Sequence, residues 1–228
     1  SGSFTIDGLS YQNEMKQLKQ IIGIVPQEYA LYPSLTAFEN LKYFGSMYGL
    51  KGSALHSKIE EHLEILGLGT FANKKVHTFS GGMKKRVSLA CALIHQPKVL
   101  FLDEPTAAVD PQLRARSWEL FRKLAQGGTT LFISTHLMDE AALCDKVTIL
   151  NQGKILLVDS PRDILNRGKT RLSVTSRDQC SQTEIESTPE AIAQKLHEFG
   201  LPNDISSVEV EPSTLEEIVL EIIREEPQ

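Results

Sequence analysis

The segment Val99-Leu100-Phe101-Leu102-Asp103-Glu104-Pro105 constrains the fold of this 228-residue chain more than any other. Its apolar residues predict a buried strand, and two carboxylates follow directly at the C-terminal end of that strand. Ligands of open parallel sheets bind at this edge, where one carboxylate can hold a metal ion and its neighbour can activate water. Acidic residues also follow buried strands simply because the chain returns to the surface. The segment alone leaves both interpretations open.

Apolar strands alternate with helical patterns along most of the chain. Strands are predicted at residues 21–25, 99–102 and 130–133, and helices at residues 36–48, 55–66 and 81–95 and from Asp110-Pro111 onward. This alternation predicts an α/β fold with a mainly parallel sheet and helices on its faces.

The composition changes near residues 170–180. From Asp178 onward the chain carries 13 acidic and 2 basic side chains, whereas the preceding residues carry 16 acidic and 22 basic ones. We therefore predict a main domain at residues 1–169 and a small α+β accessory region at residues 170–228.

The accessory region ends in a predicted amphipathic helix. Ser213 and Glu216 have the spacing of a capping box and predict the start of this helix. Its apolar face carries Leu215, Ile218, Val219, Ile222 and Ile223.

Several classes of function are not indicated by the composition. No apolar run approaches the roughly 18–20 residues that span a bilayer, so a membrane role requires a partner. No basic face interleaved with aromatic residues indicates nucleic-acid binding. Cys91, Cys144 and Cys180 are far apart and lack metal-ligand spacing, which favours reduced thiols over a disulfide or a zinc site.

The sequence Phe79-Ser80-Gly81-Gly82-Met83 begins the helix predicted at residues 81–95. Glycines allow close approach of a ligand to the backbone, and a helix N-terminus offers free N–H groups to a phosphate. A glycine-rich helix cap without a ligand is the alternative interpretation.

These segments form an ordered series. Gln27 follows a strand, Ser80-Gly81-Gly82 follows a helical stretch at about residues 30–95, and Asp103-Glu104 comes next. Ala107-Ala108-Val109-Asp110 and His136 complete the series. It resembles the Q-loop, signature, Walker B, D-loop and H-loop of ATP-binding-cassette (ABC) transporter nucleotide-binding domains, in the family's order, over residues 1 to about 165. The resemblance implies a P-loop NTPase-like sheet with an inserted helical subdomain.

The resemblance also implies a role for each residue. Asp103 would order Mg²⁺, and Glu104 would be the general base that polarises the attacking water. Gln27 would contact Mg²⁺ and that water, and His136 would brace the γ-phosphate and Glu104. Without the resemblance, a lone histidine at a strand end is more often structural.

The remaining residues would act across a dimer of cassettes. Ser80 and Gly82, with the adjacent backbone at Gly81, would grip the γ-phosphate of ATP held by the opposite subunit, and Asp110 would connect the two sites. The resemblance thus implies an ATPase that uses ATP and Mg²⁺. Its expected partners are a transmembrane permease subunit and an identical or different second cassette. Its expected place is the cytoplasmic face of the cell membrane.

Met83 stands where many family members have Gln. With the basic run Lys84-Lys85-Arg86, it resembles the branch that exports drugs, antibiotics or polysaccharides, although a solvated helix face is an equally open interpretation of that run. The C-terminal stretch Pro212-Ser213-Thr214-Leu215-Glu216-Glu217-Ile218 resembles the closing motif of the same branch. An amphipathic helix that only covers apolar surface is the alternative interpretation.

The motif G-x-x-x-x-G-K-[ST] occurs nowhere in the sequence. Gly168-Lys169-Thr170 lacks the first glycine and follows a predicted helix, so we do not expect a P-loop there. Our expectation from this departure is an N-terminally truncated cassette that exposes apolar surface and is less stable than a complete one. The alternatives to a transport ATPase are a non-transport ATPase of the same superfamily and an inactive fragment that acts as a binding module.

Overall fold

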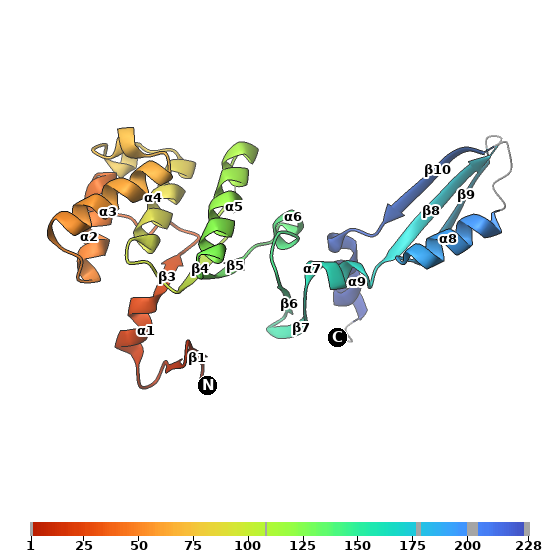
Figure 1. Ribbon diagram of the computed structural model, residues 1–228, viewed down its shortest axis with the longest axis horizontal. Helices are drawn as coiled ribbons and strands as arrows, with labels where there is room; N and C mark the ends of the chain where they lie inside the picture. Colours follow the sequence, from red (N-terminus) through yellow and green to blue (C-terminus); the bar gives the residue numbers. More distant parts are fainter. Residues whose placement is uncertain (1, 108, 177–178, 200–204, 226–228) are drawn as a thin grey trace. The chain divides into compact units, whose positions relative to one another are not determined.

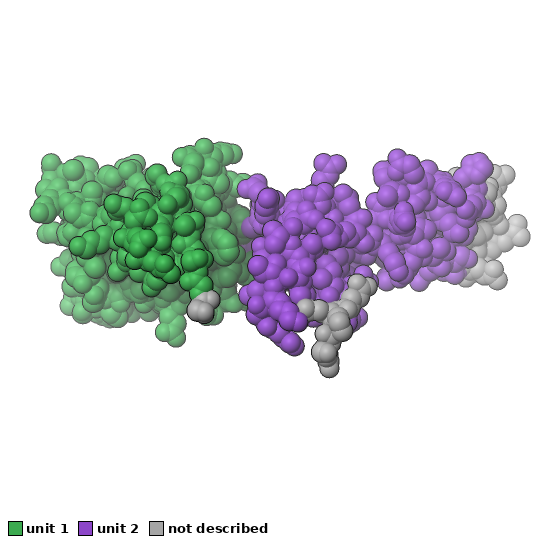
Figure 2. Space-filling view, turned by 90° about the horizontal axis from the view of Figure 1, so that it is seen from below, with its two compact units in different colours: residues 1–136 green, residues 137–228 purple. Residues whose placement is uncertain are grey.

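The computed structural model describes residues 2–107, 109–176, 179–199 and 205–225. The chain divides into two compact units, residues 1–136 and 137–228, which Figure 2 shows in green and purple. The boundary expected near residue 170 stays a prediction. A separate antiparallel sheet begins at Lys169, inside the second unit.

The first unit contains the predicted parallel sheet (Figure 1). Its strands are β3 (Ile22–Val25), β4 (Val99–Asp103) and β5 (Thr130–Ser134), in the order β3-β4-β5. The parallel pairing of β4 with both neighbours confirms the mixed α/β class. Strand β3 begins one residue later than expected, because Ile21 ends a helix, α1 (Met15–Ile21), that the sequence reading did not predict.

The two faces of this sheet differ in exposure. Leu100 and Leu102 are 0% and 2% exposed. On the opposite face, Ile24, Phe101 and Phe132 form one row across the three strands. Ile24 is 63% and Phe132 is 61% exposed, so β3 is buried on one face only, although its apolar run predicted a buried strand.

Helices inserted between β3 and β4 form the predicted helical subdomain. They are α2 (Ala37–Met47), α3 (Gly52–Ile65), the short 3-10 turns η1 (Gly69–Phe71) and η2 (Val76–Thr78), and α4 (Gly81–Leu93). The capping box at the start of α2 is present, since the Glu39 N–H donates to Thr36 Oγ1 at 3.1 Å and the Thr36 N–H to Glu39 Oε2 at 2.8 Å. Helix α5 (Pro111–Gln126) connects β4 to β5.

A short hairpin precedes α1. Strands β1 (Thr5–Ile6) and β2 (Leu9–Ser10) pair antiparallel around Asp7 and Gly8. Both turn residues have positive φ, 51° and 77°, which is the geometry of a type I′ hairpin turn.

The second unit contains a two-stranded hairpin and a three-stranded antiparallel sheet of order β10-β8-β9. Its elements are α6 (Met138–Ala141), β6 (Val147–Asn151), β7 (Lys154–Asp159), α7 (Pro161–Leu165), β8 (Lys169–Ser176), β9 (Gln179–Glu186), α8 (Pro189–Glu198), β10 (Ile205–Pro212) and α9 (Leu215–Glu225). Strand β9 was not predicted, because its alternating polar residues carry little apolar signal.

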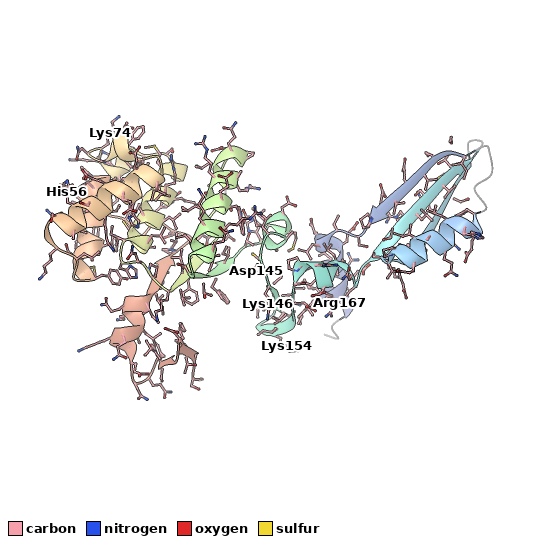
Figure 3. All side chains as sticks on the ribbon, in the orientation of Figure 1. His56, Lys74, Asp145, Lys146, Lys154 and Arg167 are labelled. Carbon is pink, nitrogen blue, oxygen red and sulfur yellow. The ribbon has the colours of Figure 1, made fainter. Side chains whose placement is uncertain are left out.

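The apolar face of α9 packs into the core of the second unit. Leu215, Ile218 and Val219 are buried against Ile149 and Ile164. At the end of α7, Arg167, labelled in Figure 3, forms an ion pair with Asp159 at 2.6 Å.

The cap of α9 differs from the predicted Ser213–Glu216 box by one residue. The Glu217 N–H donates to Thr214 Oγ1 at 3.2 Å, and the Thr214 N–H donates to Glu217 Oε2 at 2.8 Å. Ser213 instead donates its hydroxyl to the Lys169 carbonyl at 2.7 Å, so the contact with β8 takes this side chain away from the helix.

None of the described helices combines the length and the apolar character that crossing a membrane requires. The three cysteines are free thiols, as expected. Burial raises the pKa of the Cys91 thiol, which therefore stays protonated inside α4.

Gly23 lets α4 approach β3 closely, because a Cβ at this position would lie 2.6 Å from the Ala92 carbonyl oxygen and 2.8 Å from Leu100 Cδ1. We predict that Gly23→Ala lowers the free energy of unfolding by about 1–3 kcal/mol, since backbone must move to admit the methyl group. Urea denaturation measures the change. Gly2→Ala, which adds a Cβ in open space, is the matched control. Equal midpoints for Gly23→Ala and the parent protein would contradict this packing.

Candidate active site

The carboxyl edge of the parallel sheet gathers the central residues of the predicted site. Gln27 follows β3, Asp103 ends β4, Glu104 comes next, and His136 follows β5. Because parallel strands end at the same edge, residues far apart in sequence meet there.

Glu104 is the centre of this group. Gln27 donates its side-chain amide to Glu104 Oε2 at 3.1 Å, and His136 Nδ1 lies 3.0 Å from Glu104 Oε1. The tautomer of His136 that is protonated on Nδ1 donates this hydrogen bond. The Glu104 side chain is 26% exposed and the His136 side chain 64%. The carboxylate is therefore held from both sides while remaining accessible.

The backbone of Glu104 is also held from two elements. Its N–H donates to the Ser134 carbonyl at 2.9 Å, and its carbonyl accepts from Lys85 Nζ at 2.7 Å. Glu104 has φ 44°, in the left-handed region that residues with a Cβ rarely adopt. These contacts keep this uncommon conformation in place.

Asp103 lies beside Ser134 in the register of β4 and β5, and Ser134 donates its hydroxyl to Asp103 Oδ1. Ser134 was not selected from the sequence. The available signal was its position at the end of a predicted strand, two residues before His136. Only the register of β4 and β5 shows that this position lies beside Asp103.

The structure places the phosphate-gripping candidates at the start of α4. Ser80 caps the helix by accepting the Met83 N–H at 3.3 Å. A Cβ on Gly81 would lie 3.1 Å from the Tyr29 hydroxyl, and one on Gly82 would lie 2.9 Å from Leu113 Cδ2. Close packing alone therefore favours glycine at Gly82, so the phosphate and simple-cap interpretations both remain compatible with this geometry.

Asp110 caps α5, because its Oδ1 accepts the Leu113 N–H at 3.0 Å and Pro111 follows at the first helical position. Of the predicted D-loop residues, Ala108 lies outside the described part of the chain.

The basic run on α4 is not a solvated helix face. Lys85 donates to the Glu104 and Ala107 carbonyls at 2.7 and 3.0 Å. Arg86 donates to the Leu66 carbonyl at 2.9 Å, and Lys84 Nζ lies 5.9 Å from the centre of the Tyr29 ring. The run therefore joins α4 to its neighbours.

Gly168-Lys169-Thr170 does not have the geometry of a P-loop. Lys169 and Thr170 begin β8. Thr170 is 1% exposed, and its hydroxyl forms a hydrogen bond with the Ser187 hydroxyl at 2.9 Å. A P-loop instead joins a strand to a helix.

Within the described residues, no group of three or more His, Cys, Asp or Glu side chains is close enough to hold a metal ion. Mg²⁺ does not need such a group, because one or two carboxylates, water and substrate phosphates complete its six oxygen ligands. The Asp103 carboxylate and the Gln27 amide oxygen suit this donor set.

Fold and site together define an α/β protein of the P-loop NTPase type, with helices inserted before the strand that carries the acidic pair. A family profile described as "ABC transporter" matches residues 1–107. The linearmycin resistance ATP-binding protein LnrL of Bacillus subtilis is 40% identical over 212 residues, which cover 91% of this chain and 68% of LnrL. The chain belongs to the ABC transporter family of ATP-binding proteins.

Other relatives agree. The probable multidrug ABC transporter ATP-binding protein YbhF of Escherichia coli is 36% identical over 72% of this chain and 28% of YbhF. A Nod factor export ATP-binding protein I of Burkholderia lata is 38% identical over 72% of this chain and 55% of that protein. The chain thus spans much less than the full length of several relatives.

Among solved structures, cbiO1 from Clostridium perfringens, part of the ABC transporter complex cbiONQ, superposes with a TM-score of 0.64 and 29% identity. The match covers 72% of this chain and 68% of cbiO1. It supports the ABC ATPase fold for most of the chain.

Two substitutions of Asp110 separate the effect of its helix cap on stability from the effect of its charge. We predict that Asp110→Ala lowers the free energy of unfolding by about 1 kcal/mol, because the α5 cap is lost. Asp110→Asn, which keeps an acceptor oxygen, should unfold like the parent protein in urea. A loss of stability as large in Asp110→Asn would show that the charge, and not the cap, stabilises this region.

Proposed function

We propose that this chain is the ATP-binding and ATP-hydrolysing part of an ABC exporter that powers a separate membrane permease. The observation that carries the proposal is Glu104, held by Gln27 and His136 at the carboxyl edge of the sheet. The names of the relatives support it, since LnrL is a resistance protein, YbhF a probable multidrug transporter component and the Nod factor protein an export component.

The proposed reaction is attack of water on the γ-phosphate of ATP. Glu104 accepts a proton from the water as the water oxygen bonds to the γ-phosphorus. The bond from that phosphorus to the bridging oxygen breaks, and the products are ADP and inorganic phosphate. His136 and Gln27 keep the carboxylate directed at one place, which contributes to catalysis through positioning.

Asp103 and Gln27 are the residues proposed to hold Mg²⁺. When bound, Mg²⁺ neutralises charge on the phosphate oxygens. Ser134 orients the Asp103 carboxylate through its hydroxyl. One carboxylate oxygen then accepts this hydrogen bond and the other is left for the metal or its water.

Ser80, Gly81 and Gly82 are proposed to contact the γ-phosphate of ATP bound to a second cassette, with Asp110 near the junction. Support comes from Ser80, which is exposed at the N-terminus of α4, where backbone N–H groups attract anions. The second cassette is identical or different. The permease partner would keep the chain at the cytoplasmic face of the cell membrane.

Two alternatives predict different behaviour. A non-transport ATPase of the superfamily would hydrolyse ATP without a permease, and finding a permease gene beside this one would argue against it. A binding module would neither bind nor hydrolyse ATP, and the absence of G-x-x-x-x-G-K-[ST] from these 228 residues is the observation that favours it.

ATP turnover tests the proposal. We would compare the 228-residue chain with a version that carries a P-loop strand, motif and helix ahead of it, both with Mg²⁺. In the P-loop-bearing version, Glu104→Gln should lower turnover by about 10²–10⁴-fold, because the general base is lost. Glu119→Gln, on an exposed position of α5, is the matched control and should leave turnover unchanged.

The outcomes separate the alternatives. Equal turnover in Glu104→Gln and Glu119→Gln would remove Glu104 from the mechanism. If neither version binds a fluorescent ATP analogue, the ATPase proposal is wrong and the binding module is favoured.

Mg²⁺ dependence tests Asp103 separately. Asp103→Asn should keep the Ser134 contact and raise the Mn²⁺ concentration that gives half-maximal turnover, because a neutral amide binds the ion more weakly. Electron paramagnetic resonance of Mn²⁺ with ATP measures the same loss without turnover. Unchanged Mn²⁺ affinity would remove Asp103 from the metal site.

A further inference from the structure

Lys85 links two parts of the proposed machinery that lie on different elements. Ser80, the proposed contact to ATP of the second cassette, caps the N-terminus of α4, and Lys85 follows on the same helix. Its ammonium donates to the Glu104 carbonyl at 2.7 Å and the Ala107 carbonyl at 3.0 Å. One side chain thus joins the signature helix to the loop that carries Glu104.

The contact falls where the loop conformation is least favourable. Glu104 has φ 44°, and its N–H is bound by Ser134 of β5. The Lys85 contact fixes the peptide group on the other side of Glu104. Since the carboxylate direction depends on these two peptide groups, movement of α4 changes where Glu104 points.

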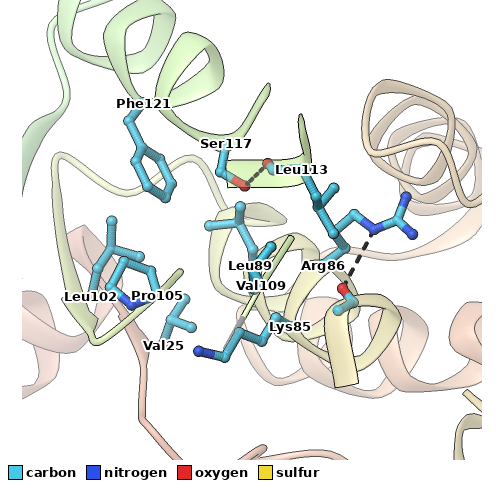
Figure 4. Close-up of a pocket in the computed structure, with 11 residues that line it drawn as sticks. Val25, Lys85, Arg86, Leu89, Leu102, Pro105, Val109, Leu113, Ser117 and Phe121 are labelled. Atoms are coloured by element: carbon cyan, nitrogen blue, oxygen red, sulfur yellow. Dashed lines mark hydrogen bonds between the residues drawn. The ribbon is translucent and has the colours of Figure 1, made fainter. Parts of the chain in front are cut away.

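The surroundings of Lys85 favour a strong contact. With Val25, Leu102 and Pro105 it lines a small cavity of about 20 Å³ between α4, α5 and the sheet (Figure 4). Hydrogen bonds of a charged group are stronger where apolar side chains exclude water. The Lys85 stem lies among apolar residues, and its ammonium donates to two backbone carbonyls. These contacts hold the side chain in one orientation.

We infer that Lys85 is a positioning residue that couples the signature helix to the general base of the same chain. When ATP bound to the second cassette contacts Ser80, Gly81 and Gly82, α4 shifts. The Glu104 backbone then moves with it, because Lys85 connects the two. Each cassette would then hydrolyse its own ATP in response to the ATP at the other site. This inference rests on the proposed function and assigns its regulation.

The test uses the P-loop-bearing protein and three variants. Lys85→Met removes the donors and keeps most of the stem, Lys85→Arg restores donors, and Lys123→Met changes an exposed lysine on α5 as the control. ATP turnover over a range of ATP concentrations gives kcat, KM and the Hill coefficient. Hydrogen exchange of the Glu104, Thr106 and Ala107 backbone amides is measured without nucleotide.

We expect Lys85→Met to lower kcat about tenfold or more, the effect of about 1.4 kcal/mol in the barrier, while KM stays within about twofold. The Hill coefficient should approach 1. The backbone amides of Glu104, Thr106 and Ala107 should exchange at least about tenfold faster, since roughly that loss follows from one charged hydrogen bond. Lys85→Arg should recover most of kcat, and Lys123→Met should match the parent in every readout.

The exchange measurement separates this inference from the proposed function. Unchanged exchange and unchanged kcat in Lys85→Met would overturn the role of Lys85 even if the parent hydrolyses ATP. A lower kcat with an unchanged Hill coefficient would overturn the coupling. If Lys85→Met does not fold, Lys85→Gln, which keeps one donor, replaces it and is judged by the same readouts. Absence of turnover in the parent would overturn the proposed function and with it the coupling.

Discussion

Parallel pairing of β4 with β3 and β5 is the constraint on which the site depends. The pairing aligns the carboxyl ends of three strands, so that Gln27, Glu104 and His136 meet although 77 and 32 residues separate the pairs that touch. It also sets Asp103 opposite Ser134. A change of register by one residue would turn these side chains to the other face of the sheet and disperse the group. Helix α4 packs closely against β3 at Gly23.

Helix α4 connects the sheet to the rest of the first unit. Its N-terminus carries the glycines that the close contacts with Tyr29 and Leu113 favour. Its next turn reaches the loop after β4 through Lys85. The α4 helix therefore belongs to the helical subdomain and also contacts the carboxyl edge of the sheet.

Local signals in the sequence predicted local structure well. Thr36 and Glu39 form a capping box at the start of the helix predicted from residue 36, and Asp110 with Pro111 begins α5 as predicted. Such caps involve residues three apart along one segment, which a sequence pattern can show. The α9 cap was misplaced by one residue, since the Ser213 hydroxyl is engaged by Lys169, 44 residues away. The sequence could not decide whether Lys84, Lys85 and Arg86 form a solvated helix face. Their partners come from distant segments, which a local pattern does not show.

What the residues alone establish here is most of the elements, with α1 and β9 the exceptions, together with the α/β class and the ordered series of motifs. These follow from periodicity and from residue types at short spacing. What only folding decides is which side chains touch: Ser134 on Asp103, Lys85 on the Glu104 and Ala107 carbonyls, and the exposure of Ile24 and Phe132 on the open sheet face. Those contacts depend on strand register and helix packing between distant segments, and no local pattern encodes either of them.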